Sequence, residues 1–289
     1  MKPRLPDRVG IALLMLVVAA PVGFSLGYAL LYSIGAVGLL SEGITAEHWL
    51  AMLQRRELWT SLLLSLHVAT TTLLFTTSAA LALALLLRRP LERGPLSALL
   101  YVPLAIPGTV AAFLTFQLFV GGGLVERWVS ALGATLGIAT PSGELVPMVH
   151  DPWALGIVAT HVALAIPFFA LLFAELYRTE AVSELETLAT SLGASRAQVL
   201  WRVTVPVLLR RASTNLVLFF IVVLGSFEIP LLLGRQTPQM LSVLTYRKFA
   251  LFDLAERPEA YVLALIYTAV VFLLLALVRR LPQEGGSLG

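Results

Sequence analysis

Three ionisable side chains lie inside long apolar segments of this 289-residue chain: His67, His161 and Glu228. An unpaired charge in hydrocarbon is costly, so ionisable residues at such places are candidates for function. A carboxylate at Glu228 would attract a cationic solute or pair with one of the histidines. The alternative is a packing role, in which each side chain reaches interfacial water or forms a hydrogen bond to a neighbouring helix. Both interpretations stay open on the sequence alone.

Several other kinds of chemistry are excluded by what the sequence lacks. The chain contains no cysteine, which rules out disulfides, thiolate metal sites and cysteine nucleophiles. It has no Gly-x-x-x-x-Gly-Lys-Ser/Thr phosphate loop, zinc-ligand helix, nucleophile elbow or pair of carboxylates within one apolar segment. The net charge is +3, but the basic residues are spread between apolar stretches and form no nucleic-acid-binding patch. We therefore expect that this chain is not an enzyme, has no nucleic-acid partner and binds no metal or cofactor itself.

The composition indicates an all-α membrane protein. Hydrophobic residues make up 58% of the chain and charged residues 13%, whereas a soluble domain carries roughly 25% charged residues. A membrane-spanning helix needs about 20 predominantly apolar residues. Six segments meet this requirement, and the first is expected to remain as an uncleaved span. They are 10–33, 58–87, 96–120, 154–177, 212–233 and 260–278.

The lysine and arginine residues between these segments predict the orientation. With the N-terminus in the cytoplasm, 13 of them fall on the inner side and 7 on the outer side. Because cytoplasmic loops carry the excess of these residues, both termini are expected in the cytoplasm. The predicted organisation is 1–57 (tail, first span and first outer loop), 58–280 (a core of spans two to six) and 281–289 (a cytoplasmic tail).

Helix-disturbing residues interrupt the third, fourth and fifth spans. They are Pro103, Pro107, Gly108, Pro167, Gly225 and Pro230. Such residues are tolerated in lipid where neighbouring helices or a water-lined cavity satisfy the freed backbone groups. This pattern favours a bundle of helices that pack on one another.

Two further spacings predict how helices are placed. Small residues recur every three or four positions in span two, which lets another helix approach closely. They are Ser61, Ser65, Ala69, Thr72 and Thr76. In the outer loop 121–153, Leu124, Trp128 and Leu132 recur every four residues, which predicts a short interfacial helix near 124–132.

The inner loop between spans four and five, 179–211, has the clearest local pattern. Residues 183–186 (Ser-Glu-Leu-Glu) form a predicted capping box, in which Ser183 accepts from a first-turn amide and Glu186 reaches back to the cap. Four apolar residues at i, i+3, i+4 and i+7 give the helix one apolar face. They are Leu185, Leu188, Ala189 and Leu192. Gly193 follows, where a left-handed residue readily ends a helix.

A second helix is predicted directly after the first. Residues 195–198 (Ser-Arg-Ala-Gln) form another capping box. Pro206 disfavours a helical Val205 and is expected to break or kink the chain there. The pattern predicts an amphipathic, basic helix–turn–helix between two spans. It suits either an interfacial element on the membrane or a docking element for a cytoplasmic partner, and periodicity does not separate the two.

The same loop resembles the EAA coupling loop of permeases from ATP-binding-cassette (ABC) importers. That signature runs Glu-Ala-Ala, three residues, Gly, nine residues, Ile, one residue, Leu-Pro. Here Gly193 is followed by nine residues and then by Val203, Thr, Val and Pro206, so valines stand at the Ile and Leu positions.

The first half of the loop departs from this signature. Thr187, Leu188 and Ala189 stand where Glu-Ala-Ala is usual, and Glu186 lies one residue early. Glu186 is therefore either the cap of its own helix or a replacement for the glutamate that helps to anchor the loop on the ATPase. The coupling residues implied by the resemblance are Glu186, Thr187, Ala189, Gly193, Ala194, Ser195, Val203 and Pro206.

The resemblance covers residues 60–277 and implies a type I importer permease with six transmembrane helices. In this family two permeases, identical or different, pair around a central path. Two ATPase subunits, which bind ATP and Mg, dock beneath them, and an extracytoplasmic substrate-binding protein delivers the solute. The three ionisable residues His67, His161 and Glu228 are the candidates for that path in this chain.

The stretch 225–234 (Gly-Ser-Phe-Glu-Ile-Pro-Leu-Leu-Leu-Gly) is most similar to the subgroup that moves polyamines, ferric iron, thiamine and related small ions. The similarity implies transport of a polyamine-type or other small solute across the cytoplasmic (inner) membrane of a bacterium or archaeon. Two other classes are kept as alternatives. One is a secondary transporter or channel not driven by ATP, and the other is an intramembrane enzyme, for which the sequence offers no catalytic constellation.

Overall fold

The computed structural model describes residues 5–38, 43–87, 95–137, 148–251 and 253–279, and these residues form helices and connections without a β-strand. Six helical stretches among them are long and apolar enough to cross a membrane: Leu13–Ser33, Arg56–Leu86, Gly108–Leu136, Leu155–Thr179, Arg196–Leu224 and Leu254–Ala276. The predicted all-α fold with six spans is confirmed. The chain divides into two compact units, one made of Met1–Leu62 and Leu241–Leu273, the other of Leu63–Met240 and Leu274–Gly289.

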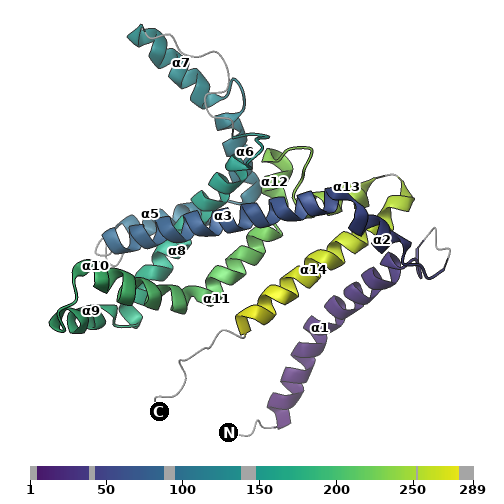
Figure 1. The fold of residues 1–289 in the computed structure, drawn as a ribbon, viewed down its shortest axis with the longest axis horizontal. Coiled ribbons are helices and arrows are strands. Elements are labelled where there is room, and N and C mark those ends of the chain that lie inside the picture. Colours follow the sequence, from purple (N-terminus) through teal and green to yellow (C-terminus); the bar gives the residue numbers. More distant parts are fainter. Residues whose placement is uncertain (1–4, 39–42, 88–94, 138–147, 252, 280–289) are drawn as a thin grey trace. The chain divides into compact units, whose positions relative to one another are not determined.

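The first unit combines helices from both ends of the chain (Figure 1). They are α1 (Leu5–Ser33), α2 (Glu47–Gln54), the start of α3 (Arg56–Leu86), α13 (Leu241–Ala250), the short helix η2 (Leu254–Glu256) and most of α14 (Arg257–Arg279). Met52, Leu58, Leu244 and Leu263 are buried together in its core. One residue from each of α2, α3, α13 and α14 therefore meets in a single apolar cluster.

An ionic cluster lies within the same unit. The buried Lys248 Nζ donates to Glu259 Oε2 at 2.7 Å. Arg55 Nη2 lies 2.7 Å from the other oxygen of Glu259, and Arg247 pairs with Glu57. These ion pairs connect the junction of α2 and α3 with α13 and the start of α14.

Among the described residues, the second unit contains the rest of α3, the end of α14 and nine further helical elements. They are α5 (Pro95–Leu104), α6 (Gly108–Phe119), α7 (Leu124–Leu136), α8 (Leu155–Thr179), α9 (Val182–Ser191), α10 (Arg196–Val199), the π-helical turn η1 (Leu200–Thr204), α11 (Val205–Leu224) and α12 (Glu228–Leu233). Helices α9 and α10 lie at one end of α8 and α11, and α6 and α12 lie toward the other end (Figure 1).

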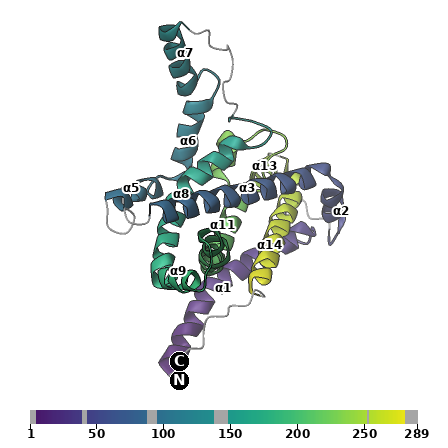
Figure 2. The ribbon, with the colours of Figure 1, turned by 60° about the vertical axis from the view of Figure 1, so that its left-hand side comes forward.

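Helix α7 extends from the end of α6, away from α8, in both views (Figure 1, Figure 2). It covers residues Leu124–Leu136 and ends at Gly137, which has φ 66°. Leu124, Trp128 and Leu132 are all exposed on it. The helix predicted from their spacing is confirmed, and its position at the membrane interface stays a prediction.

Two of the predicted spans are interrupted. Segment 96–120 divides into α5 and α6, and segment 212–233 divides into α11 and α12. Pro107 has the extended backbone (φ −61°, ψ 145°) that precedes the first turn of α6, and residues 225–227 separate α11 from α12. Pro167, in contrast, lies inside α8, which continues from Leu155 to Thr179.

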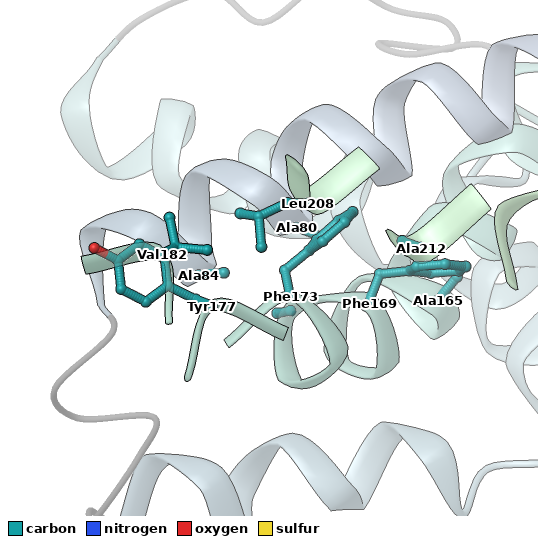
Figure 3. Packing of buried hydrophobic residues seen from close by; sticks show 10 residues of the cluster. Ala80, Ala84, Ala165, Phe169, Phe173, Tyr177, Val182, Leu208 and Ala212 are labelled. Carbon is teal, nitrogen blue, oxygen red and sulfur yellow. The ribbon is translucent and has the colours of Figure 1, made fainter. Parts of the chain in front are cut away.

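The small residues of α3 form a buried stripe. Ser61, Ser65, Ala69, Thr72 and Thr76 have no exposed surface, which confirms the prediction that they face another part of the protein. Two further small residues, Ala80 and Ala84, extend the stripe into the core of the second unit. There they pack among Phe169 and Phe173 of α8 and Leu208 of α11 (Figure 3). Only small side chains on α3 leave room for these rings.

The first prediction concerns this contact. Replacing Ala80 with leucine should destabilise the protein by about 1–3 kcal/mol, because extra methyl groups in a filled core force neighbouring side chains from their preferred rotamers. Ala79→Leu is the matched control, since Ala79 is exposed on the same helix. The measurement is the midpoint of thermal unfolding in detergent. Equal midpoints for the two variants would contradict the packing described for α3.

Candidate functional site

The first helix of the inner loop does not begin as the sequence predicts. Helix α9 starts at Val182, and its N-cap is Ala181, in a left-handed conformation (φ 48°) without a side-chain cap. The amides of Glu184 and Leu185 bond to the Ala181 carbonyl, so Ser183 lies within the first turn. The predicted capping box at 183–186 is wrong, because the N-cap lies two residues before Ser183.

Glu186 has other partners in place of the cap. Its Oε2 accepts a hydrogen bond from the Tyr177 hydroxyl at 2.6 Å. Its Oε1 accepts one from Thr204 Oγ1, also at 2.6 Å. Hydrogen bonds to a charged oxygen are stronger than those between neutral groups, which explains why the carboxylate turns toward these two hydroxyls. The capping role for Glu186 is therefore wrong.

The end of α9 agrees with the sequence. Gly193 has φ 86°, its amide donates to Thr190 O at 2.9 Å, and the amide of Ala194 donates to Ala189 O at 3.0 Å. This pair of bonds defines a Schellman motif, which requires a left-handed residue at the position of Gly193. No atom of another residue would lie within 4 Å of a Cβ at Gly193. The backbone, and not a lack of space, is what favours glycine here.

The second capping box is confirmed, but the expectation that Val205, before Pro206, is not helical is wrong. The Ser195 amide donates to Gln198 Oε1 at 2.8 Å, and the Gln198 amide donates to Ser195 Oγ at 3.4 Å. Val205 is helical (φ −63°, ψ −48°), and its amide donates to Leu200 O, five residues back. Pro206 has no backbone N–H and cannot donate the usual hydrogen bond to the carbonyl four residues back. The wider π-helical turn before it lets the helix continue without that bond.

The described residues of the chain leave the apolar face of α9 uncovered. Leu188 and Leu192 are exposed, Leu192 by 88%, and Leu185 is partly exposed at 38%. Trp201, in the π-helical turn, is exposed by 68%. Large apolar side chains at the end of a membrane bundle are expected to contact either a protein partner or the membrane surface.

The remaining predicted coupling residues lie around this face. Thr187 is exposed, and its hydroxyl bonds to Ser183 O of the same helix at 2.8 Å. Ser195 and Pro206 are exposed, whereas Ala189, Ala194 and Val203 are partly buried. The predicted coupling residues thus lie on α9, in the turn between α9 and α10, in the π-helical turn and at the start of α11.

The candidate path residues lie near the two interrupted spans. Glu228 opens α12, is exposed, and accepts a hydrogen bond from Thr109 Oγ1 of α6 at 2.6 Å. Helices α6, α8 and α12 contact one another. Thr109 was not predicted from the sequence, because a threonine in an apolar segment gives no signal of its partner. The carboxylate therefore lies at a contact between α6 and α12 beside both breaks.

His161 is buried, with 8% of its surface exposed. Its Nδ1 lies 2.8 Å from Ile157 O, and its Nε2 lies 2.9 Å from Ser226 Oγ. Because a carbonyl only accepts, Nδ1 carries a proton, and in the neutral ring Nε2 then accepts from the serine hydroxyl. His161 thus fixes α8 to the break that follows α11.

His67 occupies a different place. It is exposed on α3, and its Nε2 lies 3.2 Å from Trp153 O. Among the interactions of the described residues, Glu228 bonds to Thr109 and each histidine bonds elsewhere, so the structure does not show the pairing of Glu228 with a histidine. The same residues contain no group of three or more side chains that could hold a metal ion.

Comparison with known proteins decides the family. A sequence profile described as "Binding-protein-dependent transport system inner membrane component" matches residues 77–283, more than half of the chain. The chain belongs to this family. The resemblance seen in the inner loop is therefore confirmed, while the subgroup that moves polyamines, iron or thiamine stays a prediction.

Curated relatives match a shorter stretch. The molybdenum transport system permease proteins ModB of Mycobacterium bovis and Mycobacterium tuberculosis are each 28% identical to the chain over 170 residues. The match covers 58% of this chain and 59% of each relative, so it spans well under two thirds of their length.

Solved structures show the same fold. A bacterial ABC transporter involved in the import of the acidic polysaccharide alginate matches with a TM-score of 0.69 and 18% identity, covering 95% of this chain and 94% of that one. The bacterial alginate ABC transporter in complex with an alginate pentasaccharide-bound periplasmic protein matches with a TM-score of 0.72 and 17% identity, covering 96% and 92%. At this identity the likeness establishes the fold of an ABC importer permease and no substrate.

The second prediction concerns Gly193. Gly193→Val should loosen the end of α9, because a left-handed conformation costs an ordinary residue roughly 1–2 kcal/mol. Gly193→Asn is the control, since asparagine tolerates this conformation better than other residues. Hydrogen exchange of the amides at 189–194 is the measurement, and about 5- to 30-fold faster exchange is expected in the valine variant alone. Equal exchange in valine and asparagine variants would show that φ at Gly193 does not hold the helix end.

Proposed function

We propose that this chain is the transmembrane permease subunit of an ABC importer, forming the path for a small solute and coupling to a separate ATPase. The observation that supports it most is the uncovered apolar face of α9, which includes Leu188 and Leu192. The Schellman motif at Gly193 and the capping box at Ser195 fix the shape of the turn beside this face. A loop whose shape is fixed in this way presents a defined surface to a protein partner.

The partners follow from this proposal. ATP and Mg would bind to ABC ATPase subunits, which carry out the hydrolysis, so this chain would be a transport subunit and not an enzyme. A second permease, identical or different, would complete the path. An extracytoplasmic substrate-binding protein would deliver the solute, as the complex of the alginate transporter with its periplasmic protein suggests by analogy.

The proposed location is the cytoplasmic (inner) membrane, with both termini in the cytoplasm. The family is one of inner membrane components, and the lysine and arginine bias of 13 to 7 favours this orientation. In this orientation the loop 179–211 lies on the side where ATP is available. The segment 121–153 then lies outside, with residues 138–147 beyond those that the structure describes.

The third prediction tests the importer itself. The chain is co-expressed with an ABC ATPase and a binding protein from the same genome, and with a second permease if the pair is not identical, then purified and reconstituted into liposomes. The ATPase should co-purify, and uptake of solute should require ATP on the side of the α9 face. An ATPase variant without its phosphate-loop lysine is the control and should be inactive. Uptake that follows an ion gradient without ATP would instead support the secondary transporter or channel.

The solute is proposed from the charge beside the path. Glu228 places a carboxylate at the contact of α6 and α12, and a fixed negative charge attracts cations and repels anions in a low-dielectric environment. We therefore favour a small cationic solute, of which polyamines are one class. The ModB relatives, in contrast, are molybdenum transport proteins.

The fourth prediction separates the two kinds of cargo. For a cationic solute, Glu228→Gln should lower uptake at limiting solute by roughly tenfold, because an amide attracts a cation far less than a carboxylate does. Glu126→Gln is the control, since Glu126 lies on α7 and accepts from the Gly122 amide. The measurement is uptake by reconstituted importer at matched ATPase content. Faster uptake of an oxyanion by the Glu228 variant would contradict a cationic cargo.

A further inference from the structure

The carboxylate of Glu186 joins three segments of the chain. Glu186 lies on α9, Tyr177 near the end of α8, and Thr204 at the end of the π-helical turn that leads into α11. The two hydroxyls donate to different oxygens of the carboxylate, each at 2.6 Å. A single side chain of the coupling loop thus contacts both of the spans that the loop connects.

These contacts are internal. Tyr177 is 5% exposed and Thr204 is fully buried, so neither hydroxyl can reach a docked partner without local unfolding. Each carboxylate oxygen of Glu186 accepts a hydrogen bond from one of these hydroxyls, and the residue is only partly exposed. The apolar face of α9, by contrast, points outward with Leu188 and Leu192. The helix therefore has an outer face for a partner and an inner face that is bonded to α8 and to the start of α11.

Two more interactions hold the same segments together. Arg211 Nε of α11 lies 2.9 Å from Glu180 Oε2, at the junction of α8 and α9. At the other end, the bond between His161 and Ser226 joins α8 to the residues after α11. Polar contacts thus join the α8 and α11 segments near both ends of these helices. A displacement of α9 would carry both helices with it as long as the bonds of Glu186 hold.

We propose that Glu186 is a positioning residue, which transmits movement of α9 to α8 and α11 and does not itself contact the ATPase. The inference rests on the proposed function, in which α9 docks on an ATPase subunit. It gives Glu186 a different role from the family's anchoring glutamate, which lies one residue later in the usual signature. The two roles predict different results for the same substitutions.

The fifth prediction uses the reconstituted importer and measures solute moved per ATP hydrolysed. Glu186→Ala should lower this ratio by about tenfold, because α9 then moves without the two spans. The double variant Tyr177→Phe, Thr204→Val should lower it to a similar extent, since it removes only the two buried hydroxyls. Glu186→Gln should retain most of the ratio, because an amide still bonds to two hydroxyls. Ser213→Ala, which removes an α11 hydroxyl bonded to Arg210 O of its own helix, is the control.

A direct contact between Glu186 and the ATPase predicts a different pattern. Glu186→Gln would then lower the solute moved per ATP as much as Glu186→Ala does, because both remove the charge. The Tyr177→Phe, Thr204→Val variant would have the wild-type ratio. Either of these results would overturn the proposal.

A measurement on the permease alone separates this proposal from the proposed function. In the full chain without partners, Glu186→Ala should raise hydrogen exchange at 183–191 by about tenfold, and Glu186→Gln by much less. Unchanged exchange in the alanine variant would overturn the positioning role even if the importer is active. Wild-type protein that binds no ATPase, with the expected exchange pattern, would instead overturn the proposed function and leave the local geometry of Glu186 intact.

Discussion

Lipid offers no hydrogen-bond partners, so every backbone group within the membrane must be satisfied by the protein itself. This constraint explains where the chain departs from continuous helices. The breaks before α6 and after α11 lie in the part of the second unit where α6, α8 and α12 contact one another. Polar side chains gather at the same place, with Thr109 bonded to Glu228 and His161 bonded to Ser226. Interrupted helices and hydrogen-bonded polar side chains thus lie in one region of the second unit, some buried, as His161 is, and some exposed, as Glu228 is.

The structural features that were predicted correctly depend only on the spacing of residues along the chain. Ser65, Ala69 and Thr72 lie on one face of α3 because helical geometry places residues three or four apart together, whatever packs on them. The left-handed Gly193 and the box at Ser195 are equally local, since each bond spans only a few residues. Such features need no knowledge of the tertiary fold.

What the sequence did not predict depends on partners that are distant along the chain. Glu186 matches a capping box, but the tertiary fold brings Thr204 to it from 18 residues away, and a charged hydrogen bond to that hydroxyl outweighs the local cap. Alanine has no side-chain oxygen to cap a helix, so residue type does not predict Ala181 as an N-cap. Ala181 occupies the N-cap of α9 because the turn between α8 and α9 is short. Pro206 was expected to break or kink the chain at a non-helical Val205, but Val205 is helical and follows a π-helical turn.

The ionic cluster of the first unit bears on the orientation argument. The predicted last outer loop carries four basic residues, more than an outer loop normally does. Two of them, Arg247 and Lys248, are held by glutamates in the folded unit, Lys248 by both Glu256 and Glu259. Removing one partner of a buried pair leaves an uncompensated charge, so these residues are fixed by the folded structure. Their presence in this loop is then explained by their ion pairs, and the predicted orientation depends on the basic residues of the predicted inner loops.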